Sequence, residues 1–538
     1  MNYDPNPHAS PEEEPQDNTS SENESSPYPP FFVQPIPSVK PTYRGRDALF
    51  AWLSIAVGFL FVRTMPLHKT TLGALLFFLL LYAFGGAYLR LSGIRLDRSV
   101  YLLAGGTAIL SLGMITGGNA VIRGFLAFFL LLSFLFWIYC VARREGEHVF
   151  GDALIACIFR ALFVLPFASL DHIFRSLFAF PKKGEKTSHV LRSVGWALLG
   201  LGVAVIPTAV IVLLLSYDES FTKLLEQIFS FSMEGAWELI RDLILGFLSA
   251  ILLFSALFAV KWRRERTDNS EKPKGINTHV FPKALLCAAV TPILAVYVIF
   301  FISQWDYYVS AFTHVLPGDL TYAAYAREGF FQLCTVCALN AVFLLLFHLL
   351  MRRSSQKRDV IKSVYSTVIS VFTLILIATA MAKMMLYIES YGLTQKRVYS
   401  SWLMLTLAIM FILVLIATVL PKMRMIPALV LTAVLCFGLI AIPDVDGMIA
   451  SYNVDAYLEG DLATVDVDLL ADYGSPAVPA LVKLRDTLSK RPATPDTDAL
   501  LKRADAALAT VKRDLEKVPD SFFYFNIPDA RARALLKE

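Results

Sequence analysis

The sequence predicts an all-α, polytopic membrane protein, with about eleven transmembrane helices and a small helical domain at the C-terminal end. Two observations predict this class. Apolar residues make up 56% of the 538 residues and charged residues only 17%, whereas soluble domains average about a quarter charged. Apolar stretches long enough to cross a bilayer also recur from residue 48 to residue 442. Lipid would then be the solvent for most of the chain, which favours helices that satisfy their own backbone hydrogen bonds.

The first element is an acidic tail, residues 1–41. It is rich in Pro, Ser, Asn and Glu, and its first lysine or arginine is Lys40. Such a segment buries too little apolar area to offset the entropy lost on ordering, so we expect it to be disordered. It lacks the basic start and apolar core of a signal peptide, and we expect it to stay in the cytoplasm.

The transmembrane domain is expected over residues 42–446. A hydrocarbon core of about 30 Å needs about 20 helical residues that rise about 1.5 Å each. The third span is the weakest, because Gly105, Gly106 and Gly113 dilute its apolar character. The expected spans lie near residues 48–66, 71–89, 99–116, 120–142, 193–216, 238–261, 283–303, 330–351, 363–383, 400–420 and 426–445.

The charges between these spans predict the orientation. With eleven spans, all six strongly basic loops fall on one side; examples are Arg143 with Arg144, and Lys422. The opposite loops carry acids such as Asp218 and Asp319. Basic loops stay in the cytoplasm, so we expect the N-terminus inside, the C-terminus outside, and the protein in a bacterial inner membrane.

Two stretches are apolar without forming a clean span. Residues 149–180 mix apolar residues with Asp152, Arg160 and Arg175, which predicts helices in the inner membrane interface. A re-entrant pair of helices is the alternative. Residues 218–232 predict a short helix on the outer face, with apolar side chains on one stripe.

After the last span the composition becomes that of a soluble domain. Residues 447–538 are charged with nearly balanced signs, and residues 477–488 and 498–515 have helical periodicity. We expect a small extracytoplasmic helical domain that leans on the membrane part. Residues 451–538 would be the contact for an envelope protein partner.

The first candidate cluster lies around the start of the eighth span. Ionisable groups near membrane depth are costly, and function is the default hypothesis for them. Asn340 would lie about 18 Å deeper than Glu328 at about 1.5 Å per residue. The ligand-binding candidates here are Asp306, Tyr322, Tyr325, Arg327, Glu328, Gln332 and Asn340.

The second candidate cluster ends the ninth span, where Lys383, Tyr387 and Tyr391 follow one another at four-residue intervals. Glu389 and Arg397 complete it. We predict that both clusters line one outer vestibule, in which Glu328 pairs with Lys383 or Arg327. The alternative is that the tyrosines gather at the interface, as aromatic residues do, and that Arg327 and Glu328 only pair at a helix end.

No motif for a cofactor, a metal or nucleic acid is present in the sequence. Cys334 and Cys337 have CxxC spacing inside an apolar helix, where small buried hydrophobes are the expected use. His348 has no second ligand at metal spacing. A net charge of +4 is too small and too dispersed for a nucleic-acid interface. We expect no cofactor and no catalytic residue, and the sequence favours a non-enzymatic function over an enzymatic one.

Four motifs resemble an uncharacterised bacterial membrane family, the domains of unknown function numbered forty-one seventy-three, with a relative numbered forty-one fifty-three. The resemblance spans most of the chain after Asp47 and implies location, not an activity. The motifs lie at residues 322–333, 386–397, 450–453 with Asp466 and Asp468, and 521–526.

Three functions remain open from the sequence. The first is a transporter or permease-like protein with an outer polar vestibule, whose small-molecule or lipid ligand is unknown. The second is a membrane-embedded enzyme acting on a lipid-linked or envelope substrate. The third is an envelope sensor or assembly partner that acts through the C-terminal helical domain.

Overall fold

The computed structural model describes most of the chain after residue 40. It divides into two units, Met1–Thr42 and Tyr43–Glu538, and the elements named here belong to the second. The predicted acidic tail therefore lies almost wholly outside the described residues. The described residues are 41–64, 70–142, 151, 154–179, 200, 208, 211, 215, 233–265, 282–303, 330–350, 360–420 and 422–537.

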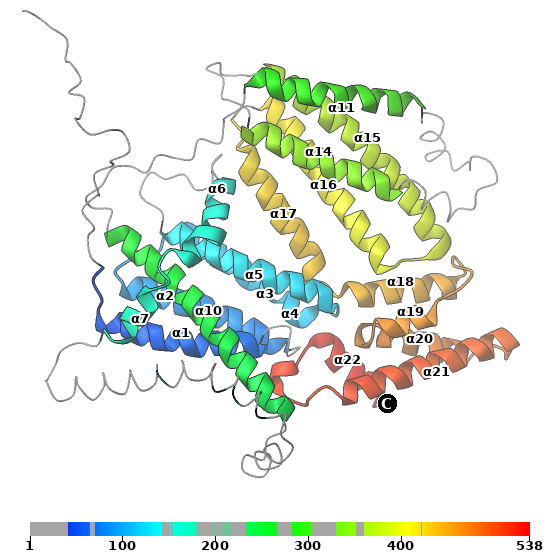
Figure 1. Ribbon diagram of the computed structural model, residues 1–538. Coiled ribbons are helices and arrows are strands. Elements are labelled where there is room, and N and C mark those ends of the chain that lie inside the picture. The colour runs from blue at the N-terminus through cyan, green and yellow to red at the C-terminus, as the bar shows by residue number, and fades with distance from the viewer. Residues whose placement is uncertain are drawn as a thin grey trace, which may run out of the picture. The chain divides into compact units, whose positions relative to one another are not determined.

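Every regular element in these ranges is helical, and the chain is a multi-pass membrane protein (Figure 1). In the part of the chain that the structure describes, eight helices are long and apolar enough to cross a bilayer, or nine if one bent pair is a single span. The predicted class is confirmed and the count of eleven is not. The eight are α1 (Gly45–Thr64), α2 (Leu72–Leu91), α3 (Arg98–Ser111) continued by α4 (Gly113–Thr116), α5 (Ala120–Val141), α10 (Met233–Glu265), α14 (Phe330–Leu350), α15 (Val360–Tyr391) and α16 (Gln395–Val419).

The other three predicted spans differ from this set. Residues 193–216 lie outside the described residues, apart from four isolated positions. Helix α11 (Lys283–Ser303) has its apolar part in the shorter stretch Cys287–Ser303. Helix α17 (Met425–Ala441) is bent by 59° from the helix that follows it, α18 (Val445–Glu459).

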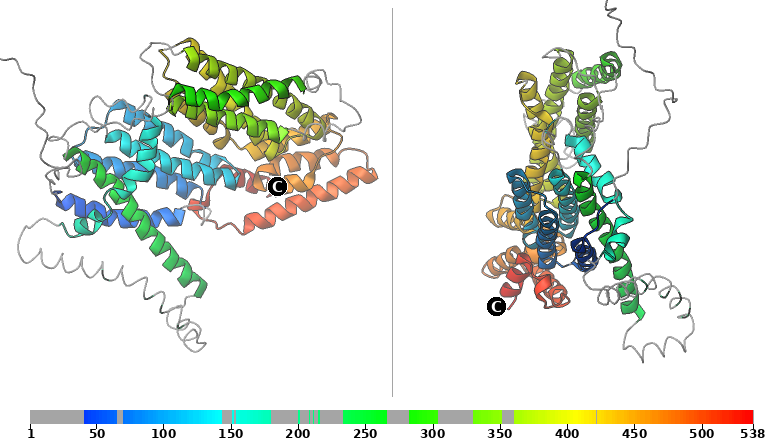
Figure 2. Two further views of the ribbon diagram at one scale, coloured as in Figure 1. Left: turned by 45° about the horizontal axis from the view of Figure 1, so that its top comes forward. Right: turned by 90° about the vertical axis from the view of Figure 1, so that its left-hand side faces the viewer.

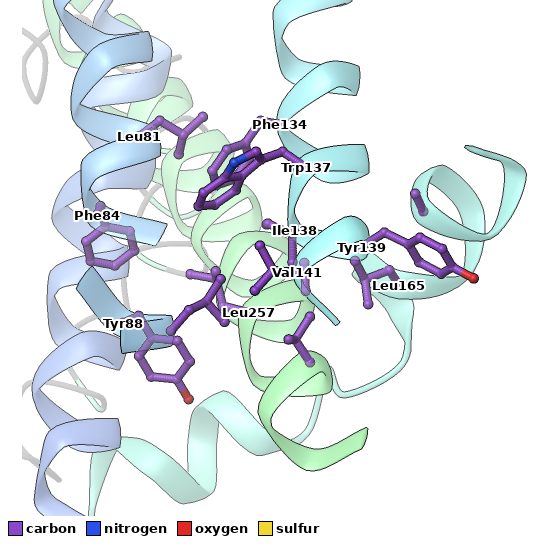
Figure 3. Packing of buried hydrophobic residues seen from close by; sticks show 14 of the residues in the cluster. Leu81, Phe84, Tyr88, Phe134, Trp137, Ile138, Tyr139, Val141, Leu165 and Leu257 are labelled. Atoms are coloured by element: carbon purple, nitrogen blue, oxygen red, sulfur yellow. The ribbon is translucent and has the colours of Figure 1, made fainter. Parts of the chain in front are cut away.

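A first hydrophobic core joins α1, α2, α5 and α10, which lie side by side (Figures 1 and 2). The close view in Figure 3 shows Leu81 and Phe84 of α2, Trp137 of α5 and Leu257 of α10 within it. The backbones of α1 and α10 approach so closely that a Cβ on Gly58 would stand 2.2 Å from the carbonyl oxygen of Gly246. Small residues at a helix crossing are typical of membrane helices, since packing replaces the hydrophobic effect there.

A second core joins α14, α15 and α16, with α11 against them. Its fully buried side chains include Phe330, Phe347 and Phe411. Cys337 is also buried in this core, as expected of a small hydrophobe.

The stretch predicted to lie in the membrane interface forms short helices with two unlike faces. They are α6 (Leu154–Phe159), a π turn (Arg160–Val164), a 3-10 turn (Leu165–Phe167) and α7 (His172–Leu177). Leu154, Ile173 and Leu177 are buried in the first core. Phe159 and Phe163 are exposed by more than half. Both the interfacial and the re-entrant arrangement fit such a segment.

The C-terminal module has a core of its own and begins with α18. Ala450 and Val454 of α18 lie in one hydrophobic cluster with Leu481 and Leu484 of α20, so we assign α18 to this module and not to a span shared with α17. The module's other elements are α19 (Val467–Asp472), the 3-10 turn η5 (Ser475–Ala477), α20 (Val478–Leu488), α21 (Pro495–Glu516), the 3-10 turn η6 (Phe522–Tyr524) and α22 (Ile527–Leu535).

A candidate polar centre between three helices

Three helices, α11, α14 and α15, meet through side-chain hydrogen bonds inside the second core. The Tyr297 hydroxyl donates to Oδ1 of Asn340 at 2.6 Å. Nδ2 of Asn340 donates to Oγ1 of Thr373 at 2.9 Å, and that hydroxyl donates to the Ile369 carbonyl. Asn340 is 2% exposed and stands near the middle of α14. The chain of bonds therefore crosses the bundle at about the middle of a span.

Two further hydroxyls lie on the same face of α15. Ser366, Ser370 and Thr373 are spaced four and three residues apart, which places them on one side of the helix. All three are 0% exposed. The Oγ atoms of Ser366 and Ser370 have no hydrogen-bond partner among the described residues. We call Tyr297, Asn340, Ser366, Ser370 and Thr373 the polar centre.

A buried hydroxyl with no partner is costly in the bilayer core, where no bulk water can replace the bond. Thr379 shows how α15 avoids that cost elsewhere, because its hydroxyl donates to the Ile375 carbonyl at 3.0 Å. Ser366 and Ser370 do not use this route. The polar centre thus offers hydroxyl groups to a molecule that could hydrogen-bond with them.

Among the predicted site residues that the structure describes, Lys383 is the most deeply buried, at 1% exposure. It lies ten residues beyond Thr373 and, at about 100° per residue, on a different side of α15 from the polar centre. Lys383 and the polar centre are therefore two separate buried polar features of one helix.

Past Lys383, the end of α15 is closed by Arg397. Its guanidinium lies 3.9 Å from the centre of the Tyr387 ring, and that ring is 5.4 Å from the ring of Tyr391. Nη1 of Arg397 donates to the carbonyls of Tyr391 and Gly392. The cation thus binds an aromatic face and the last carbonyls of the helix together, two favourable uses of an arginine.

The turn between α15 and α16 is held by the C-terminal module. The Asn453 side chain of α18 accepts from the Leu393 amide at 2.6 Å and donates to the Leu393 carbonyl at 2.8 Å. Gly392 has a φ of +72°, and a Cβ there would stand 2.5 Å from Oδ1 of Asn453. Both the backbone conformation and the close contact require glycine.

Asp446, also on α18, joins two distant membrane helices. Its carboxylate accepts from Nε2 of Gln395 at 2.9 Å and from Nδ2 of Asn119 at 3.4 Å. It is 3% exposed, and burial raises its pKa above the usual value while the Gln395 and Asn119 bonds oppose that shift. Nearby, burial raises the pKa of Tyr473 for the same reason. We call Asn119, Gln395, Arg397, Asp446 and Asn453 the capping cluster.

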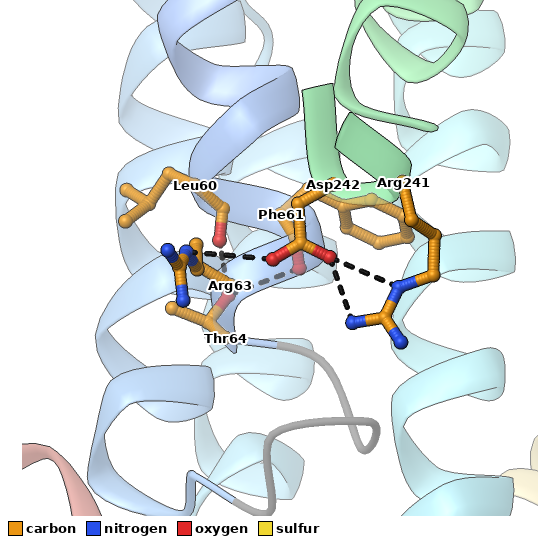
Figure 4. A network of polar contacts seen from close by, with 6 residues as sticks. All are labelled: Leu60, Phe61, Arg63, Thr64, Arg241 and Asp242. Atoms are coloured by element: carbon orange, nitrogen blue, oxygen red, sulfur yellow. Dashed lines mark hydrogen bonds and ion pairs between the residues drawn. The ribbon is translucent and has the colours of Figure 1, made fainter. Parts of the chain in front are cut away.

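A third polar feature, at the two ends of the α1–α10 pair, was not predicted from the sequence. Nζ of Lys261 lies 2.7 Å from Oδ2 of Asp47, the two side chains are 2% and 0% exposed, and the Tyr88 hydroxyl donates to Asp47. Figure 4 shows the other end, where Asp242 lies between Arg63 and Arg241. The Asp47–Lys261 and Arg63–Asp242 pairs join α1 to α10 near opposite ends and so fix the register of the two helices.

The predicted site residues thus separate into five groups. Asn340 belongs to the polar centre, and Lys383 is buried beyond it. Tyr387 and Arg397 lie at the closed end of α15, with Tyr391 half-exposed beside them. Gln332 and Glu389 are exposed. Those outside the described residues are Asp306, Tyr322, Tyr325, Arg327 and Glu328.

The predicted pairing of Glu328 with Lys383 or Arg327 remains a prediction for that reason. Sequence reasoning missed Tyr297, Ser366, Ser370 and Thr373. Hydroxyls inside an apolar helix give little signal, because many bond to their own backbone; the four-and-three spacing of the α15 hydroxyls was the available clue. Within the described ranges, no group of three His, Cys, Asp or Glu side chains is placed to hold a metal ion.

Comparison with known proteins gives one match. The family model described as "Domain of unknown function (DUF4153)" matches residues 104–484, well over half of the chain. No curated protein matches the chain, and no solved structure does. The match supports a family of unknown function, the one named above as the relative, forty-one fifty-three; the resemblance of the motifs to forty-one seventy-three, and a relation between the two families, are not confirmed by it.

Proposed function

This chain belongs to the DUF4153 family of unknown function, and we propose that it is a transporter or permease-like protein of the bacterial inner membrane. The polar centre would receive a small polar solute near the middle of the bilayer. Midplane sites between membrane helices are the usual place for solutes in secondary transporters. The capping cluster would then lie over one end of the same helices.

The observation that carries this proposal is the pair of buried hydroxyls on Ser366 and Ser370. Leaving a buried donor without a partner costs about 1–3 kcal/mol in proteins. A helix that only packed against its neighbours would be more stable with alanine at these positions. Beside them, Asn340 and Tyr297 supply further hydrogen-bonding groups. A neutral polar solute that both donates and accepts hydrogen bonds is the ligand this chemistry favours.

We also propose that the C-terminal module faces outward. The six basic loops support this orientation by the positive-inside rule. Three membrane helices contact the module at one end: α2 through Thr71, α5 through Asn119 and α16 through Gln395. With alternating spans, those ends belong to loops that carry little positive charge.

Ligand-dependent melting tests the proposal. Purified protein would be heated with a panel of sugars, amino acids, nucleosides and polyols, since a ligand at 100 times its Kd stabilises by about 2.7 kcal/mol. We expect one class to raise the Tm of the unaltered chain and to lose that effect in Ser370→Ala. Thr379→Val is the matched control, because its hydroxyl bonds only to its own helix. If a solute raised the Tm of Ser370→Ala as much as that of the unaltered chain, the polar centre would not be its binding site.

An envelope sensor is a second candidate, favoured by Asp446. That side chain bonds to α5 through Asn119 and to α16 through Gln395, so one module position depends on two membrane helices. A sensor would change the exposure of the module when a ligand binds. If a solute that stabilises the protein also changed the rate at which a protease cleaves α21, this candidate would be favoured over transport alone.

A further inference from the structure

The C-terminal module carries a short aromatic segment that the proposed function does not use. Phe522, Phe523 and Phe525 are exposed by 68%, 52% and 46%, on and just after the 3-10 turn η6 between α21 and α22. We call residues 522–525 the aromatic tongue. Large apolar side chains exposed side by side mark an interaction surface, whereas single exposed ones are ordinary.

The backbone of the tongue is fixed to the start of a membrane helix. The Thr71 amide donates to the Phe523 carbonyl at 3.2 Å, and the Thr71 hydroxyl donates to the Phe525 carbonyl at 2.6 Å. Thr71 is 2% exposed and immediately precedes α2. The tongue therefore lies at the level where α2 enters the bilayer, not at the far end of the module.

The surface next to the tongue is a lipid-facing one. Leu76, Leu79 and Leu80 of α2 are 40–43% exposed within a span of high mean hydropathy, so lipid covers them. Gly73, two residues after Thr71, lies beside the Phe523 ring: a Cβ on it would stand 3.4 Å from Cδ1 of that ring, in ordinary van der Waals contact. Exposed apolar side chains thus lie both on the first turns of α2 and on the segment bonded to its start.

We infer that the aromatic tongue inserts into the bilayer surface and anchors the C-terminal module to lipid. Aromatic side chains are enriched at the boundary between hydrocarbon and headgroups. The two Thr71 bonds hold the backbone at that boundary while the phenylalanine rings remain free to enter the lipid. The module would then be held by the capping cluster on one side and by lipid on the other. A second copy of the chain, or another protein, would be the competing occupant.

Photocrosslinking distinguishes these occupants. The full chain would carry p-benzoylphenylalanine in place of Phe522, in nanodiscs of phosphatidylethanolamine and phosphatidylglycerol. This residue keeps the aromatic ring, and the exposed position tolerates the added group. The control carries the same residue in place of Thr510, an exposed position on α21. After irradiation, mass spectrometry would identify the adducts.

We expect phospholipid adducts at position 522 at least tenfold above those at position 510. Adducts between two chains would show that a second copy occupies the tongue and would overturn the inference. Absence of lipid adducts at position 522, or equal yields at both positions, would overturn it as well. Repeating the experiment at Phe523 keeps the result independent of the geometry of one ring.

Discussion

Buried polar side chains in this protein divide into those that hold helices together and those that offer unused hydrogen bonds. Asp47 and Lys261 satisfy each other, with Tyr88 as a third partner. Ser366 and Ser370 have no partner among the described residues. Only the second kind gives a ligand something to bind, so the buried ion pair is a structural feature here and the unpaired hydroxyls are the functional candidates.

The sequence singled out some of these residues and not others for physical reasons. Asn340 and Lys383 stand out because each is a strongly polar group within an apolar run. Asp47 lies just before the predicted start of a span, where an acid resembles an ordinary residue of the first helical turn. Lys261 sits among arginines that set membrane orientation. Their pairing joins positions 214 residues apart, which no local pattern reveals.

The Asp47–Lys261 pair is predicted to be strongly coupled. Asp47→Asn or Lys261→Met alone should each cost about 3–5 kcal/mol of unfolding free energy, because each leaves one buried charge without its partner. The double variant should cost clearly less than the sum. Titration with a denaturing detergent measures the unfolding free energy of the unaltered chain, of the two single variants and of the double variant. The exposed pair Lys483–Asp455 is the control, with an expected coupling of about 0–1 kcal/mol; additive losses at Asp47 and Lys261 would contradict the account.

At the scale of helices, hydropathy predicted where spans lie in the sequence but not which helices they pack against. The first and second predicted spans, 48–66 and 71–89, differ from α1 and α2 by only a few residues at each end. The sixth, 238–261, is the apolar part of a 33-residue helix, α10, whose ends are charged. The close packing of α10 along α1 is a tertiary property. It depends on Gly58 and Gly246 facing each other, and a glycine in a sequence does not show which helix it meets.

The crossing of α1 and α10 is predicted to tolerate no side chain. In Gly58→Ala the new methyl would collide with the Gly246 backbone, and overpacking of this kind costs about 1–3 kcal/mol. Melting in one detergent compares it with Gly105→Ala, where nothing lies within 4 Å of the new Cβ. That control should be neutral or more stable by about 0.5–1 kcal/mol, since alanine favours a helix over glycine. Equal melting temperatures for both variants would show that the helices do not cross at Gly58.

At the scale of the whole molecule, the C-terminal module contacts helices from early and late parts of the chain. Asp446 reaches α5 and α16, and the aromatic tongue reaches α2. A soluble helical module was predictable from its composition and periodicity. Its attachment was not, because Asn119, Gln395 and Asn453 are ordinary polar residues at helix ends until the fold brings them together.

The central claim is that a polar solute entering from the aqueous phase can reach the polar face of α15. Ser366→Cys and Ser370→Cys would be treated in intact cells with a membrane-impermeant, thiol-specific reagent, and the labelling of the unaltered chain subtracted. Val371→Cys, at a position 44% exposed on the lipid side of the same helix, is the control for α15. Thr510→Cys reports whether the module faces outward.

We predict labelling at positions 370 and 510 and none at position 371. A polar solute bound in the polar centre should slow the labelling at position 370 and leave the rate at position 510 unchanged. Labelling requires the thiolate, which forms in water and not in lipid. If positions 366 and 370 stay unlabelled both in intact cells and in inside-out membrane vesicles, while position 510 reacts in intact cells, no solute can reach the polar centre from the aqueous phase and the transport proposal fails.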